Sequence, residues 1–169
     1  MPRQEAAFSK VIGALYRATE GNGVLLTSMG KDGRSNVMTI GWGLYGRSYH
    51  GRPVVAVAVR PARYTFALLD AVEEFVLAVP TEDMADVVAF CGTKSGREYD
   101  KFAETNLTGV PSVRVGPMSI AECPINIECR IYHKERPPHY MLTPEHREKP
   151  VEEQHTIYFA EVLGTYTWA

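Results

Sequence analysis

A tight turn between two strand-like segments is the feature that most constrains the fold of this chain. Lys31-Asp32-Gly33-Arg34 places an Asp-Gly pair between Val24–Ser28 and Ser35–Leu44, and both flanking segments have the residue pattern of strands. Asp-Gly is favoured at the centre of two-residue hairpins, where the backbone needs positive φ. The sequence therefore predicts an antiparallel pair of strands near its beginning.

Further strand-like segments outnumber the helical ones, and hairpin-type links outnumber the crossovers that parallel strands require. Val54–Val59, VVAVAV, is an almost purely apolar run and predicts a buried strand. The other expected strands are Glu74–Val79, Ser119–Tyr132 and Thr156–Tyr166, and the expected helices are Glu5–Tyr16, Ala62–Ala71, Thr81–Phe90 and Arg97–Glu104. We therefore expect one mainly β domain over residues 1–169, an antiparallel barrel with a few short helices.

The segment Gly41–Gly46, GWGLYG, has the G-x-G-x-x-G spacing of the dinucleotide-binding fingerprint. That fingerprint needs a helix that begins at its glycines. Here the chain continues with residues 47–53, RSYHGRP, which hold another glycine and a proline and do not favour a helix. We interpret GWGLYG as a strand end and a connection, where glycines let the backbone lie close to a flat ligand.

Two other segments have the residues to hold an anion. Residues 60–65, RPARYT, lead from a strand into a helix, where free amides, a positive dipole end and two arginines gather. Residues 91–97, CGTKSGR, combine small residues, hydroxyl groups and bases, and successive N–H groups of such loops can bind phosphate. The alternatives stay open at this point: a plain strand-to-helix junction with solvated arginines, and a flexible surface turn.

Composition argues against several other classes of protein. The formal net charge is −2 and basic residues are scattered, so we expect neither a nucleic-acid partner nor an anionic membrane surface. No apolar stretch approaches the ~20 residues that cross a bilayer, and the first ten residues lack the apolar core of a secretory signal. Three cysteines without a metal-binding motif favour a reducing, cytoplasmic compartment and no metal site.

Five blocks of sequence resemble the flavin reductase-like proteins and occur in the order that they take in that family. They are residues 36–42 (NVMTIGW), 60–65 (RPARYT), 91–102 (CGTKSGREYDKF), 121–130 (AECPINIECR) and 155–162 (HTIYFAEV). The resemblance extends from about Gly23 to Val162, and the flavoredoxin branch is the most similar. It implies a split β-barrel that binds FMN and forms a homodimer.

The resemblance also implies which residues contact FMN. Residues 36–42 would run along the isoalloxazine ring, with Thr39 as a candidate for a hydroxyl contact. The helix start at 60–65 and the loop 95–97, together with Lys101, would hold the ribityl phosphate. Arg97 and Lys101, four apart on the expected helix, would share one face. The full implied set is Asn36, Met38, Thr39, Ile40, Trp42, Arg60, Arg63, Tyr64, Thr65, Cys91, Ser95, Gly96, Arg97, Lys101 and Phe102.

Several of these residues also have a simpler interpretation. Tyr64 and Phe102 would be core aromatics, Thr39 an ordinary β-branched strand residue, and Cys91 an inert buried thiol rather than a redox group.

At several positions this sequence differs from the family pattern, and these differences leave the identity of the electron donor undecided. Many relatives have Gly-Asp-His where this chain has Glu153-Gln154-His155, so the docking of NADH or NADPH beside His155 is an open question. Ala78 stands where relatives commonly have Asn. The segment 133–154 is longer than expected, and would cover the flavin or grip the other subunit.

Three functions therefore remain. The first is an oxidoreductase that passes electrons from NAD(P)H through flavin to free flavin, ferric iron or a protein. The second is a flavoredoxin-type carrier without nicotinamide binding. The third is a non-catalytic flavin-binding protein. In the first two the cofactor performs the chemistry, so no side chain need act as acid or base.

Overall fold

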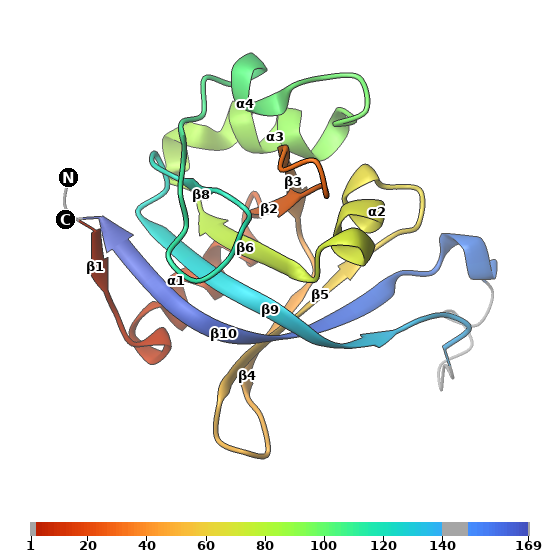
Figure 1. The fold of residues 1–169 in the computed structure, drawn as a ribbon, viewed down its shortest axis with the longest axis horizontal. Coiled ribbons are helices and arrows are strands. Elements are labelled where there is room, and N and C mark those ends of the chain that lie inside the picture. Colours follow the sequence, from red (N-terminus) through yellow and green to blue (C-terminus); the bar gives the residue numbers. More distant parts are fainter. Residues whose placement is uncertain (1–2, 140–148, 169) are drawn as a thin grey trace.

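The protein is described by a computed structural model for residues 3–139 and 149–168, which form a curved antiparallel sheet with helices around it (Figure 1). The strand order is β3-β2-β6-β9-β10-β5-β4, and β1 pairs with β10. The strands are β1 (Arg3–Glu5), β2 (Val24–Met29), β3 (Ser35–Ile40), β4 (Gly43–Arg47), β5 (Pro53–Val59), β6 (Glu74–Val79), β9 (Ile125–Glu135) and β10 (Thr156–Trp168). Every pair in this sheet is antiparallel, so the expected fold class is confirmed.

One helix packs against β2, β4, β6 and β10, and the others gather beside β3. The first helix, α1 (Phe8–Glu20), begins later than expected because Arg3–Glu5 pairs as a strand with the end of β10. Three further helices gather beside β3: α2 (Tyr64–Ala71), α3 (Ala85–Thr93) and α4 (Lys101–Glu104) (Figure 1). A 3-10 turn, η1 (Glu82–Met84), leads into α3. The N-terminal strand and the end of β10 lie side by side, which brings the two ends of the described chain together.

Strand β2 is buried on both faces, because it separates two apolar clusters. Val24 and Leu26 point into the larger cluster, which β5, β6, β10 and α1 complete. Leu25 points to the other face, where Val88 and Cys91 of α3 cover it. Alternate residues of a strand face opposite sides of the sheet, so a strand that is buried along its length needs a cover on each side. The second cover fixes α3 over β3 and thereby sets the position of the loop that follows α3.

The expected strand Ser35–Leu44 is in fact two strands, β3 and β4. The chain changes its pairing partner at Gly41 and Trp42, because β3 pairs with β2 whereas β4 pairs with β5. The segment GWGLYG therefore ends one strand and begins the next, with no helix after it. This confirms that the spacing of its glycines does not mark a dinucleotide fold.

The expected strand Ser119–Tyr132 is also interrupted. A short strand, β8 (Ser119–Ile120), pairs with β7 (Gly109–Val110), and β9 begins only at Ile125. The buried side chain of Asn126 holds the turn between them, because its Nδ2 donates to the carbonyl oxygens of Ile120 and Cys123, each at 3.0 Å. These side-chain bonds replace strand pairing over the turn.

The helix expected over Arg97–Glu104 is limited to α4. Its N-cap is Asp100, whose Oδ1 accepts from the Ala103 N–H at 3.3 Å. The residues after Ser95 form a turn instead of a helix. The prediction that Arg97 and Lys101 share one helix face is therefore wrong.

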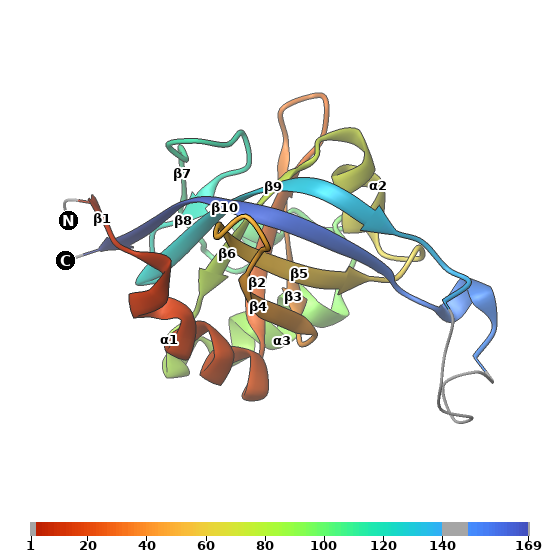
Figure 2. The same ribbon diagram turned by 90° about the horizontal axis from the view of Figure 1, so that it is seen from below.

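The segment 133–154 is partly an extension of the sheet. Strand β9 continues to Glu135, and a 3-10 turn, η2 (Val151–Glu153), precedes β10. The ends of β9 and β10 reach beyond the rest of the sheet (Figure 2). Residues 140–148, on which the expected cover or arm depends, lie outside the described residues. Within the described ranges, no helix is long and apolar enough to span a membrane.

Candidate functional site

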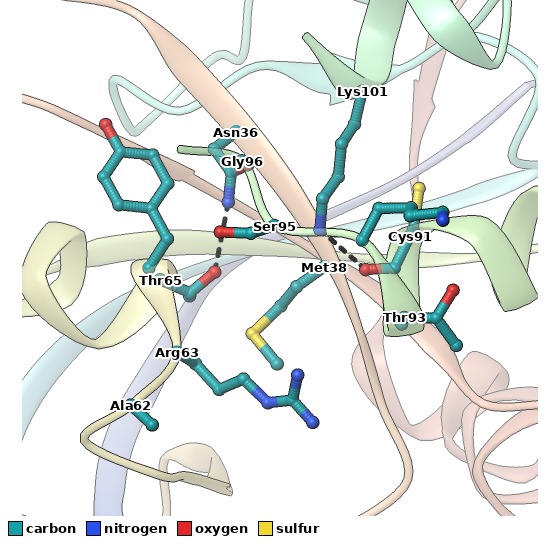
Figure 3. A pocket seen from close by; sticks show the side chains of 13 residues that line it. Asn36, Met38, Ala62, Arg63, Thr65, Cys91, Thr93, Ser95, Gly96 and Lys101 are labelled. Carbon is teal, nitrogen blue, oxygen red and sulfur yellow. Dashed lines mark hydrogen bonds between the residues drawn. The ribbon is translucent and has the colours of Figure 1, made fainter. Parts of the chain in front are cut away.

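The candidate site is a pocket between β3, the start of α2 and the loop that connects α3 to α4 (Figure 3). Its volume, open mouth included, is about 420 Å³. The residues that line it are Asn36, Met38, Ala62, Arg63, Tyr64, Thr65, Cys91, Gly92, Thr93, Lys94, Ser95, Gly96 and Lys101. Three segments that are far apart in the sequence therefore meet at one hollow.

The side chain of Lys101 is the most unusual feature of this pocket. It is only 4% exposed, and its Nζ donates to the carbonyl oxygen of Cys91 at 2.7 Å. Over the described residues, no carboxylate forms an ion pair with it. Burial and the nearby charge of Arg63 lower the pKa of Lys101. A buried ammonium group normally has an anionic partner, so this arrangement leaves room for one from outside the chain.

Arg63 brings a second positive charge to the opposite wall. Figure 3 shows its side chain entering the pocket from the α2 side, while Lys101 reaches in from the α4 side. Arg63 is the N-cap residue of α2, and its side chain accepts no hydrogen bond from the helix. The Arg63 carbonyl oxygen accepts from the Phe66 N–H at 3.1 Å, whereas the Thr65 amide has no side-chain acceptor from this residue. The positive end of the helix dipole adds to the two bases at this wall.

Packing between Asn36, Thr65 and Gly96 fixes the third side of the pocket. Asn36 Nδ2 donates to Thr65 Oγ1 at 3.1 Å, and both side chains are buried. A Cβ atom placed on Gly96 would lie 2.0 Å from Asn36 Oδ1 and 2.9 Å from the Tyr64 ring. Only glycine allows the loop to approach this closely. The loop backbone therefore lies against β3 and α2 at a fixed distance.

The structure separates the sequence-predicted residues into two groups. Those that it brings together in the pocket are Asn36, Met38, Arg63, Tyr64, Thr65, Cys91, Ser95, Gly96 and Lys101. Those that it places elsewhere are Thr39, Ile40, Trp42, Arg60, Arg97 and Phe102. Ala62, Gly92, Thr93 and Lys94 also line the pocket, although we did not single them out. All four fall inside the two segments predicted to hold an anion, and nothing else in the sequence pointed to them.

Arg97 does not line the candidate pocket but lines an adjoining hollow, which shares Asn36, Tyr64, Gly96 and Lys101 with it. Its guanidinium is 5.3 Å from the centre of the Tyr64 ring, and its NH1 donates to the Ala62 carbonyl oxygen at 3.2 Å. It therefore braces the loop against the start of α2 from outside. Phe102 packs beside the second apolar cluster, as expected of a core aromatic.

The side chains of Thr39 and Ile40 stabilise the fold. The Thr39 hydroxyl donates to the Val88 carbonyl oxygen of α3 at 2.5 Å, so this proton is not offered to a ligand. Ile40 is 3% exposed and belongs to the main core. Neither side chain lines the pocket.

The Cys91 thiol is buried, and burial raises its pKa to about 11. At neutral pH the group is therefore protonated, and a protonated thiol is a poor nucleophile. This agrees with an inert thiol. Cys91 contributes to the site through its carbonyl oxygen, which accepts a hydrogen bond from Lys101 Nζ.

Trp42 and His155 lie together in a second pocket, on the β5 and β10 side of the sheet, with Ala58 and Ile157. Strand β3 connects the two pockets, because Asn36 and Met38 line the first and Trp42 follows the end of the same strand.

Sequence comparison finds curated relatives over parts of the chain, and two of them are described here. An uncharacterized protein of Archaeoglobus fulgidus is 39% identical over 98 residues, which is 58% of this chain and 54% of that protein. An uncharacterized protein of Pyrococcus abyssi is 40% identical over 79 residues, or 47% of this chain and 45% of that protein. The chain thus spans about half the length of the curated relatives it matches.

Solved structures match over more of the chain. The flavoredoxin of Desulfovibrio vulgaris (Miyazaki F) has a TM-score of 0.70 at 25% identity, covering 86% of this chain and 69% of that one. An FMN-binding domain of a flavin reductases-like enzyme from Shewanella baltica has a TM-score of 0.69 at 17% identity, covering 98% and 77%. At these identities the second likeness is one of fold, and it confirms the split barrel. The profile of the "Flavin reductase like domain" matches residues 16–168, so this chain belongs to the flavin reductase-like family.

Proposed function

We propose that the pocket holds the phosphate of FMN and that the protein is a flavin-dependent electron-transfer protein, acting as an oxidoreductase. The observation that carries the proposal is the buried Lys101 ammonium, which has one carbonyl partner and no carboxylate within the described residues. Arg63 and the start of α2 add positive potential across the pocket. A phosphate would supply the missing negative charge and accept the remaining hydrogen bonds.

The side chains present fit the phosphate end of FMN better than they fit a neutral ligand. Lys101 and Arg63 would neutralise its charge from two sides. The backbone at Gly96 approaches closely enough to present amide groups, since no side chain intervenes. Asn36 holds Thr65 in place through its hydrogen bond, so the hydroxyl and the helix start keep their position.

FMN, when bound, supplies hydride and single-electron transfer at its ring. The chain's own residues bind and orient it, and β3 offers the surface that leads away from the phosphate pocket. Met38 lines that pocket and Trp42 lies four residues farther along, a separation of at most roughly 13 Å even for an extended chain. A flavin ring lying along this strand would reach the pocket of Trp42 and His155.

Our first candidate for the overall reaction is electron transfer from NADH or NADPH through FMN to an acceptor such as free flavin, ferric iron or a protein. Membership of the flavin reductase-like family supports it. The second candidate is a carrier that takes electrons from a protein donor, supported by the likeness to a flavoredoxin over 86% of the chain. A flavin-binding protein without turnover is the third.

Anaerobic mixing separates these candidates. The FMN-loaded protein is combined with NADH or with NADPH, and the flavin absorbance near 450 nm is followed over time. Rapid bleaching by either nucleotide supports the first candidate. Absence of bleaching by both, with full reduction by dithionite, contradicts it and leaves a protein donor or no turnover. Reduction by a reduced carrier protein without nucleotide then supports the second.

The proposal extends to a homodimer. Two apolar side chains beside the edge strand β4 support it, since Leu44 is 62% exposed and Trp42 is 41% exposed. Large exposed apolar side chains on an edge strand favour contact with another chain. Light scattering of the FMN-loaded protein should give twice the chain mass of 18.8 kDa. A monomer mass at micromolar concentration would contradict the dimer.

A further inference from the structure

The candidate pocket adjoins a larger hollow, the one that Arg97 lines. The hollow has a volume of about 950 Å³, open mouth included, against about 420 Å³ for the pocket itself. The two meet at four residues that line both, and the buried Lys101 is one of them. A phosphate on Lys101 would therefore lie where the pocket and the hollow meet.

The order of residues along β3 indicates which part of a flavin nucleotide the hollow would receive. Asp32 and Arg34, in the turn before β3, line the hollow together with Ser35, the first residue of the strand. Met38, farther along β3, lines the pocket but not the hollow. A flavin ring that runs from the pocket toward Trp42 therefore points away from the hollow. A group attached beyond the phosphate, such as the adenosine monophosphate half of flavin adenine dinucleotide (FAD), would enter the hollow.

Three carboxylates line the hollow: Asp32, and Glu98 and Asp100 in the loop before α4. Asp32 Oδ1 accepts from the backbone N–H of Arg34 at 3.1 Å. Asp100 Oδ1 accepts from the Ala103 N–H at 3.3 Å. Within the described residues, no lysine, arginine or histidine forms an ion pair with any of the three carboxylates. Their negative charges therefore have no cationic partner in contact.

The bases that line the hollow compensate these charges only in part. Lys101 would pair with the flavin phosphate. The Arg97 guanidinium lies 5.3 Å from the centre of the Tyr64 ring and donates to the Ala62 carbonyl oxygen at 3.2 Å. Arg34 is the other lining cation. With Lys101 paired, the lining residues carry three negative and two positive formal charges, so the hollow disfavours a further anion.

We infer that this hollow makes the site selective for FMN against FAD, with Asp32, Glu98 and Asp100 as the residues that determine the selectivity. They oppose the second phosphate of the dinucleotide, whereas the single phosphate of FMN is bound in the pocket by Lys101 and Arg63. Repulsion of the wrong ligand is a general source of specificity. The inference rests on the proposed function, because it requires a flavin phosphate at Lys101.

Calorimetric titration of the ligand-free full chain with FMN, FAD and riboflavin tests the inference. Wild type should bind FMN at least tenfold more tightly than FAD. Glu98→Lys reverses the charge of an exposed side chain, and Asp32→Asn removes a charge while it keeps the Oδ1 acceptor of the turn. FAD affinity should rise about tenfold in Glu98→Lys and about threefold in Asp32→Asn, as expected for partly solvated charges. FMN affinity should change less than about threefold in both.

Glu82→Lys is the matched control. Glu82 is also an exposed glutamate without an ion pair among the described residues, and it lines neither the pocket nor the hollow. The same charge reversal there should leave the ratio of FMN affinity to FAD affinity unchanged. Raising NaCl from about 0.05 M to about 0.5 M should reduce the difference between wild type and Glu98→Lys, because salt screens exposed charges. An effect of side-chain size would not respond to salt.

Two results would overturn the inference: a wild type that binds FAD as tightly as FMN, or a ratio of FMN affinity to FAD affinity that Glu98→Lys leaves unchanged. The first would show that the hollow accepts the adenosine half, and the second that its carboxylates do not determine the selectivity. Riboflavin identifies a failure of the proposed function. A wild type that binds riboflavin as tightly as FMN has no phosphate at Lys101, whereas a preference for FMN over riboflavin with an unchanged ratio for FAD refutes this inference alone.

Discussion

Replacement of Lys101 by methionine tests whether the ammonium group of this residue binds a phosphate. Methionine retains most of the buried apolar volume and removes only the ammonium group, which donates to Cys91 and has no acidic partner among the described residues. A charge-assisted hydrogen bond contributes roughly 1.5–3 kcal/mol. FMN affinity should therefore fall by about 10- to 150-fold, at 1.4 kcal/mol per factor of ten.

In the ligand-free protein, Lys101→Met should change the stability little. Burial lowers the pKa of Lys101, so the folded state holds this charge at a free-energy cost that methionine removes. The same substitution leaves the Cys91 carbonyl oxygen without its donor, which costs free energy in the opposite direction. Without FMN, the free energy of unfolding of Lys101→Met should therefore lie within about 1 kcal/mol of the wild-type value.

The assay is fluorescence titration with FMN and with riboflavin, which differs from FMN by lacking the phosphate. Lys101→Met should lose FMN affinity and keep riboflavin affinity. Arg97→Gln is the matched control, because its guanidinium lies outside the pocket over the Tyr64 ring, and FMN affinity should change less than threefold. Equal losses for both ligands, or a larger loss in Arg97→Gln than in Lys101→Met, would refute the assignment of the phosphate to Lys101.

Three further predictions follow from other parts of the structure. Gly96→Ala should lower the free energy of unfolding by about 1–3 kcal/mol, measured in urea, because its Cβ would lie 2.0 Å from Asn36 Oδ1, whereas Gly46→Ala meets nothing within 4 Å and should be nearly neutral. Glu128→Gln should lower the free energy of unfolding by about 1–3 kcal/mol, because this buried carboxylate accepts from two successive backbone N–H groups in the loop before β8. A loss below about 0.5 kcal/mol, as for a typical surface substitution, would contradict that role. His155, whose pKa is lowered from 6.5, takes its proton in the unfolded state first, so wild-type stability should fall relative to His155→Gln as pH drops below 6.5. Parallel stability curves of the two proteins from pH 7.5 to 5 would show that reasoning to be wrong.

The strand pairing was predictable because local signals and long-range packing agree. The Asp32-Gly33 turn lies between β2 and β3 as expected, and Glu74–Val79 is a strand with the predicted bounds. The break at Gly41 and Trp42 was not predictable, because the residues on both sides have strand character. It arises where the chain leaves one partner strand for another, which is a property of the assembled sheet.

The family resemblance named most of the residues that line the candidate pocket, but it did not indicate how their side chains lie. Arg97 and Lys101 look equivalent in the sequence, as two bases four residues apart. The Asp100 cap delays the helix until Lys101, which turns one base into the pocket and leaves the other outside it. Burial of a lysine depends on the whole fold, because the composition of a segment does not indicate which of its charges loses contact with water.

The contribution of Gln154 to the second pocket was hidden for the same reason. Gln154 looks like an ordinary polar residue after a pair of glutamates, yet it is buried and bonds to backbone on both sides of residues 140–148. His155 was singled out only through the resemblance. Its neighbours Arg60 and Arg63 come from a segment more than 90 positions earlier, and only the pairing of β5 with β10 brings them near it.

A crystal structure of this protein with FMN tests the central claim most directly. The account predicts one FMN per chain, with phosphate oxygens within hydrogen-bonding distance of Lys101 Nζ and of the loop amides at Ser95 and Gly96, and with the ring along β3 toward Trp42. A phosphate that faces solvent, or that binds away from Lys101 while the pocket keeps its present form, would contradict it.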